Sequence, residues 1–143
     1  MRYLAVALFP LLLGSCAQGA GGTPEAGPTN CGLLTVKQSA DPELIPEPLR
    51  LGGEIEVATT EIKQGRLLAA MNVRLTVNES FDAYKKAVGE TGLEILQEDN
   101  EGFEAELYVG DGKELGSVVI RRSLCEDAVV VYLNLVAPRE RSA

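Results

Sequence analysis

Alternation of apolar and polar residues dominates residues 54–136. The longest such run spans residues 67–77, where every second residue is apolar. A period of two is typical of a β-strand with one buried face. Shorter apolar segments at 54–60, 93–99, 103–109, 117–124 and 128–136 indicate further strands, so we expect six strands in all.

The period changes between residues 78 and 92, where the spacing predicts a helix. Its apolar residues recur at helical spacing: Phe81, Tyr84 and Val88. We expect Asn78 or Ser80 to cap its start, and Gly92 fits the position just beyond its end.

This order of elements, β-β-α-β-β-β-β, predicts an α+β domain. Short glycine-containing connections around Gly65, Gly102 and residues 110–116 favour hairpins between successive strands. We therefore expect a mainly antiparallel sheet with the helix packed on one face. The domain is predicted to span residues 52–137, followed by a tail at 138–143.

Residues 31–51 are predicted to form an extended segment that covers the domain. Asp41 and Pro42 offer a helix cap and a first-turn proline for a single turn. Pro46 and Pro48 then exclude a regular helix.

The fourth strand is expected to place one set of side chains outside the core. Alternation predicts inward Phe103, Ala105, Leu107 and Val109, and outward Glu104, Glu106 and Tyr108. Tyr132 is expected on the same outer face. The outward residues of this strand and Tyr132 are our candidate interaction surface, with cross-strand packing of the tyrosines as the alternative.

The first fifteen residues have the layout of a secretory signal. Arg2 precedes an apolar run of about eleven residues, and small residues follow. The run is too short to span a bilayer, which needs ~20 apolar residues. A buried N-terminal helix or strand is the alternative.

Residues Leu13-Gly14-Ser15-Cys16 resemble the lipobox of bacterial prolipoproteins. The resemblance implies that residues 1–15 are removed and that the Cys16 thiol carries diacylglycerol, which attaches the protein to a membrane on its extracytoplasmic side. By the same resemblance, Ala17 in place of Asp favours the outer membrane in a two-membrane cell. Ordinary secretion with cleavage nearby is the alternative.

Residues 16–30 are predicted to be a flexible tether. They contain four glycines and two prolines but no aliphatic residue larger than alanine. Such a segment buries too little apolar surface to offset its ordering entropy.

If Cys16 carries lipid, as the resemblance implies, Cys31 and Cys125 remain as a pair. In an oxidising compartment we expect them to form a disulfide. Two separate thiols are the alternative. A metal role is not expected, because the chain has no histidine and structural zinc needs four ligands.

The charge balance excludes classes of partner. Without residues 1–15, which hold one basic residue, 12 basic residues face 21 acidic residues. An acidic chain is poorly suited to nucleic acid, and it offers no polybasic clamp for anionic lipid.

No enzyme activity and no cofactor are expected from the sequence. Without histidine, neither a Ser-His-Asp nor a Cys-His arrangement can be built. Pairs of carboxylates are abundant but unspecific, so we assign no catalytic residue.

Two predicted loops contain candidate ligand residues. The acidic run comprises Glu98, Asp99, Glu101, Glu104 and Glu106. A calcium site is one interpretation, but the run lacks the EF-hand order of ligands, which favours a solvated hairpin.

The glycines and lysine of residues 110–116 do not match a phosphate loop and predict a plain hairpin. Arg121 and Arg122 point to opposite faces, so they cannot act as a pair.

The sequence therefore indicates a lipid-anchored envelope protein with an interaction or accessory domain. The expected partner is an envelope protein or a wall polymer. The alternative is a module that binds a small ligand or a cation in a pocket between helix and sheet.

Overall fold

The computed structural model describes residues 31–52, 55–125 and 127–137. The predicted signal, the lipidation residue Cys16, the tether and the tail at 138–143 lie outside the described residues.

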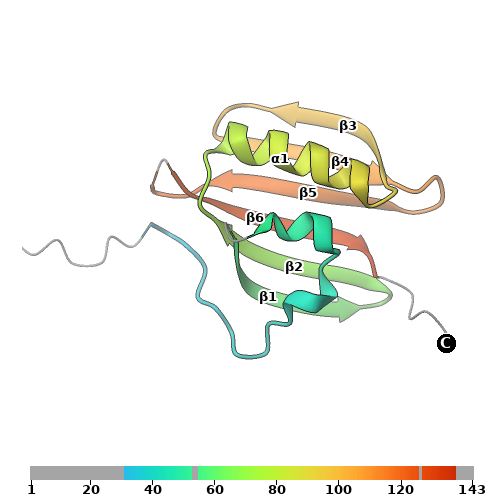
Figure 1. The fold of residues 1–143 in the computed structure, drawn as a ribbon, viewed down its shortest axis with the longest axis horizontal. Coiled ribbons are helices and arrows are strands. Elements are labelled where there is room, and N and C mark those ends of the chain that lie inside the picture. The colour runs from blue at the N-terminus through green and yellow to red at the C-terminus, as the bar shows by residue number, and fades with distance from the viewer. Residues whose placement is uncertain (1–30, 53–54, 126, 138–143) are drawn as a thin grey trace, which may run out of the picture.

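Within these described residues the fold has six antiparallel strands and one α-helix (Figure 1). Two 3-10 turns come first: η1 (Pro42–Leu44) and η2 (Glu47–Arg50). The strands and helix follow as β1 (Ile55–Lys63), β2 (Arg66–Val73), α1 (Val77–Glu90), β3 (Glu94–Asn100), β4 (Glu104–Gly110), β5 (Leu115–Arg122) and β6 (Val129–Val136). This order confirms the predicted α+β architecture.

The sheet has the strand order β1-β2-β6-β5-β4-β3. Strands β3 to β6 form a meander, and β6 returns to pair with β2. Helix α1 connects β2 to the far edge strand β3, so it must cross the sheet. It lies over β3, β4 and β5, beside η2 (Figure 1). None of the helices in the described ranges combines the length and apolar character that a membrane span requires.

A single core fills the space between one face of the sheet and the elements that cover it. We call this face the inner face and the opposite one the outer face. Tyr84 and Val88 of α1 are fully buried against it, as are Ile45, directly after η1, and Leu49 of η2. Alternate residues of the strands supply the other side, including Leu67, Met71, Val73, Leu107, Val118, Ile120, Val129 and Val131.

The helix begins earlier than the sequence predicts, and neither Asn78 nor Ser80 caps it. Strand β2 ends at Val73, and Val77 is the first helical residue. Thr76 is the cap: its hydroxyl accepts from the Glu79 N–H at 3.3 Å, and the Glu79 carboxylate accepts from the Thr76 N–H at 2.9 Å. This reciprocal capping box satisfies two backbone donors at the helix start, and it holds the pKa of Glu79 below its ordinary value.

Phe103 is not buried in the core, contrary to the sequence prediction. It is 53% exposed and precedes β4, directly after a turn in which Gly102 has φ +81°. Its carbonyl accepts from the Arg122 N–H at 2.9 Å. The backbone ladder thus extends one residue beyond the packed core, which does not reach the Phe103 ring.

The segment that precedes the sheet, residues 31–51, is named the strap here. The sequence predicted an extended cover with a single turn after Asp41; η1 is that turn, and η2 adds a second one. The Asp41 carboxylate accepts from the Glu43 N–H at 3.0 Å, which caps η1 as the sequence suggested. Two prolines keep η2 to one short turn, and this turn buries Leu49 completely.

A disulfide joins the start of the strap to the turn between β5 and β6. It links Cys31 to Cys125, the predicted pair, across 94 positions of sequence. The Leu124 N–H also donates to the Cys31 carbonyl at 2.7 Å. A loop of this length corresponds to about 4–5 kcal/mol of stabilisation in the chain-entropy description.

Tyr84 provides a test of the core through pH. Burial raises its pKa above the ordinary value of 10.0, because the phenolate would lose its water. Above that value the unfolded chain releases the Tyr84 proton and the folded chain keeps it, so this group lowers the free energy of unfolding as pH rises, by up to ~1.4 kcal/mol per pH unit.

We expect Tyr84→Phe to remove this part of the alkaline slope. Near neutral pH the change in stability should stay within ~1 kcal/mol, since the hydroxyl donates a long hydrogen bond, 4.0 Å, to the weak acceptor Met71 Sδ. Urea unfolding of both proteins between about pH 8 and pH 11 measures the difference. Parallel stability profiles would contradict the buried, neutral Tyr84.

Candidate binding face

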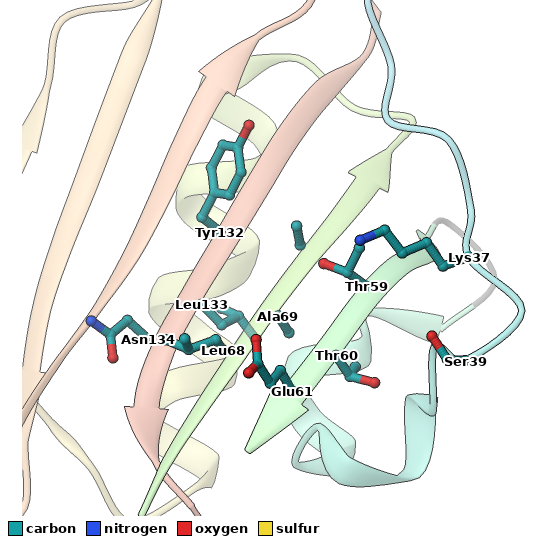
Figure 2. Close-up of a pocket in the computed structure, with 11 residues that line it drawn as sticks. Lys37, Ser39, Thr59, Thr60, Glu61, Leu68, Ala69, Tyr132, Leu133 and Asn134 are labelled. Atoms are coloured by element: carbon teal, nitrogen blue, oxygen red, sulfur yellow. The ribbon is translucent and has the colours of Figure 1, made fainter. Parts of the chain in front are cut away.

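The outer face of the sheet is the candidate functional surface. The strand register places alternate residues there, and α1 lies behind the sheet when this face is viewed (Figure 2). Its residues on the central and edge strands are Glu56, Thr59, Glu61, Leu68, Ala70, Asn72, Glu104, Glu106, Tyr108, Ser117, Val119, Arg121, Val130, Tyr132 and Asn134.

Tyr108 and Tyr132 share this face but do not touch across neighbouring strands. Tyr132 is paired with Val119 of β5, whereas Tyr108 is paired with Ser117 of the same strand. One whole strand therefore separates the two rings, which are also staggered by two residues. Both remain exposed, at 43% for Tyr108 and 38% for Tyr132, and they are two separate aromatic positions.

Tyr108 belongs to an apolar patch that the sequence reasoning missed. Leu96 and Leu115 both lie over Gly110: a β-carbon at Gly110 would come within 3.0 Å of Leu96 Cδ1 and 3.5 Å of Leu115 Cδ2. Leu96 is 53% exposed and Leu115 is 67% exposed. We call Leu96, Tyr108 and Leu115 the apolar patch.

A break in the strand register causes Leu96 to point outward. The pairing of β3 with β4 shifts between Ile95 and Gln97, so two residues oppose one at Leu96. The sequence signal for this bulge is the Ile95-Leu96 pair in an otherwise alternating strand. Two consecutive apolar residues in a strand with one buried face suggest a bulge.

The two predicted carboxylates of β4 are already engaged. Glu104 pairs with Arg121 at 3.1 Å between Oε2 and Nε. Glu106 accepts a hydrogen bond from the Tyr108 hydroxyl, and this bond together with the negative charge raises the pKa of Tyr108. These acids therefore orient neighbours on the face.

The structure separates Glu98 from the other four members of the acidic run. Glu98 turns to the helix side, where it pairs with Lys85 Nζ at 2.7 Å. Asp99, Glu101, Glu104 and Glu106 line a small hollow of ≈140 Å³. Among residues 31–52, 55–125 and 127–137, no group of three or more candidate ligands is arranged to hold a metal ion.

The glycine-rich loop between β4 and β5 is a closed hairpin turn. The Asp111 carboxylate accepts from the N–H groups of Lys113 and Glu114, at 2.9 Å each. These bonds hold the pKa of Asp111 below its ordinary value. Because the N–H groups of Lys113 and Glu114 donate to the Asp111 carboxylate, they do not form a phosphate-binding site.

A larger hollow, of ≈600 Å³, opens on the outer face over β1, β2 and β6 (Figure 2). Its floor includes Leu68, Ala70 and Tyr132, and the strap adds Lys37 and Ser39 along one side. The alternative interpretation of the sequence was a pocket between helix and sheet. This hollow lies on the opposite side of the sheet.

Asn72 holds the strap against this face. Its side-chain oxygen accepts from the Leu34 N–H at 2.8 Å, and its amide donates to the Leu34 carbonyl at 2.9 Å and to Glu56 Oε2 at 3.2 Å. Next along the strap, the Lys37 N–H donates to the Ala58 carbonyl at 2.9 Å. The strap thereby passes from the outer face around the β1 edge.

We expect Asn72→Ala to release the first part of the strap. The Leu34 N–H and carbonyl would lose both partners, which should cost about 1–3 kcal/mol of unfolding free energy. Urea unfolding measures the loss, and faster hydrogen exchange at the Leu34 amide locates it.

Asn134→Ala on the same face is the matched control, since the Asn134 side chain accepts only from the exposed Arg66 side chain. Its effect should stay within about 0.5 kcal/mol. Equal losses in the two variants would contradict the special role of Asn72.

Comparison with protein-family models, with curated protein sequences and with solved structures finds no match to this chain.

Proposed function

We propose that this protein is a bacterial lipoprotein whose extracytoplasmic domain binds a partner protein of the cell envelope. Lipid on Cys16 attaches it to the membrane, and the outer face of the sheet receives the partner. The domain acts as an accessory module and catalyses no reaction.

Two features support the anchored, extracytoplasmic location. Leu13-Gly14-Ser15-Cys16 resembles a lipobox. The Cys31–Cys125 disulfide fits an oxidising compartment, because cytosolic proteins rarely keep structural disulfides.

The exposure of the apolar patch is the observation that carries the binding role. Leu96, Tyr108 and Leu115 are all more than two-fifths exposed on a face that α1 leaves uncovered. Exposed apolar clusters with an aromatic member are typical of protein-binding surfaces. Leucine side chains suit the apolar side chains of a protein better than the hydroxyl-rich surface of a wall polymer.

The ≈600 Å³ hollow favours a second candidate function, the binding of a small polar ligand. Its volume falls in the range of ligand sites, and Lys37, Glu61 and Tyr132 offer a cation, a carboxylate and an aromatic ring around it. A ligand here would sit between the strap and Tyr132.

Lipid attachment predicts a defined mass for the mature protein. We expect the membrane-extracted protein to begin at Cys16 and to carry at least two acyl chains. Cys16→Ser should shift the protein from the membrane to the soluble fraction, because the anchor supplies the membrane affinity. An unmodified Cys16 in intact-mass spectra would refute the anchor.

Site-specific photo-crosslinking in cells tests the binding face. A photoreactive amino acid at Leu115 should give a discrete protein adduct, and Leu96→Asp should strongly reduce the yield of that adduct by placing a charge in the contact. The matched control carries the same photoreactive group at Lys86, which is exposed on α1 behind the sheet. Equal adducts from both positions, or none from Leu115, would contradict binding by the outer face.

A further inference from the structure

The end of the sheet at which the strap begins carries the most exposed large apolar side chain of the described residues. Leu124 is 84% exposed, and it immediately precedes the disulfide residue Cys125. Its N–H donates to the Cys31 carbonyl at 2.7 Å, and a β-carbon on Gly32 would lie 3.3 Å from Leu124 Cγ. Leu124 therefore stands directly beside the point where the chain enters the domain.

Phe103 adds a second apolar side chain at the same end. It is 53% exposed, and its carbonyl accepts from Arg122 at the end of β5. Leu124 follows Arg122 by two residues. Figure 1 shows that the strap starts at this end, beside the β5–β6 turn, whereas β6 ends at the opposite end of the sheet.

The chain length between Cys16 and Cys31 keeps this end close to any lipid on Cys16. Fifteen residue steps separate the two cysteines, so they can lie at most about 50 Å apart. A chain of this composition has an r.m.s. reach of roughly 20 Å. Strand β5 itself extends about 27 Å along its eight residues, so the opposite end of the sheet lies on average farther from the membrane.

We propose that Leu124 and Phe103 rest in the headgroup region of the membrane that holds Cys16. This inference rests on the proposed lipid anchor and adds the orientation of the domain. Two exposed apolar side chains bind a bilayer weakly when free in solution. Attachment through Cys16 makes the contact intramolecular, with an effective concentration of about millimolar.

This orientation places the apolar patch at the end that faces away from the membrane. Leu115 starts β5 and Leu124 follows its end, so the two leucines mark opposite ends of one strand. A partner can then reach Leu96, Tyr108 and Leu115 without displacing the domain from the lipid surface. The acidic character of the chain favours neutral over anionic headgroups.

Tryptophan fluorescence on vesicles tests the orientation, because the natural chain contains no tryptophan. The mature chain, residues 16–143, is coupled through its Cys16 thiol to a maleimide lipid in phosphatidylcholine vesicles. Leu124→Trp and Leu115→Trp each supply a single reporter, and part of the phosphatidylcholine carries brominated acyl chains as a quencher. Both sites are more than half exposed, so both variants should fold.

We expect the Leu124→Trp emission to shift to shorter wavelength and to be quenched by the brominated lipid, while Leu115→Trp stays at its solution wavelength and unquenched. Adding Phe103→Ser to Leu124→Trp should lower the quenching. The matched reporters control for the affinity of tryptophan itself for membrane interfaces. Equal quenching of the two reporters, or no quenching of Leu124→Trp, would overturn the orientation.

The result is independent of the anchor proposal, because the vesicle experiment supplies the lipid chemically. An unmodified Cys16 in cells refutes the anchor and leaves the fluorescence difference unchanged. Equal quenching refutes the orientation and leaves a lipidated Cys16 intact.

Discussion

Burial of one face of a six-stranded sheet is the constraint on which the rest of this structure depends. A single 14-residue helix covers β3, β4 and β5 but leaves the β1–β2–β6 side open. The strap completes the cover with Ile45 and Leu49, which are as fully buried as Tyr84 of the helix. Because the strap supplies part of the core, its attachment by Asn72 and the disulfide stabilises the fold.

The outer face remains available to a partner because the helix and most of the strap cover the inner face. All covering elements of the described chain except the first residues of the strap are used on the inner side. Most residues of the outer face are polar or charged, and Glu104 and Glu106 of β4 interact with Arg121 and Tyr108 respectively. The apolar patch is exposed on this mostly polar face. The binding proposal therefore rests on the apolar patch and not on the carboxylates.

Local periodicity was sufficient to predict the strands, the helix and their order, since each depends on residues close in sequence. It failed where two periods overlap: Leu75 and Val77 continue the strand alternation, so the cap at Thr76 was missed. Phe103 was misplaced because alternation shows parity but not where the core ends. The apolar patch over Gly110 and the hydrogen bonds of Asn72 to the strap each join separate segments of the chain. The Ile95-Leu96 pair signals the bulge, but no local pattern shows which residues from other segments meet there. The Cys31–Cys125 pairing was predictable because only two cysteines remained in the domain.

The position of the disulfide also determines how the domain bears mechanical load. Tension on residues before Cys31 passes through the covalent bond to Cys125, between the central strands β5 and β6. The strap beyond Cys31 and the edge strand β1 lie outside that path. A pull on the chain before Cys31 therefore acts on strands that are hydrogen-bonded on both sides, and it does not peel the strap from the core while the disulfide is intact.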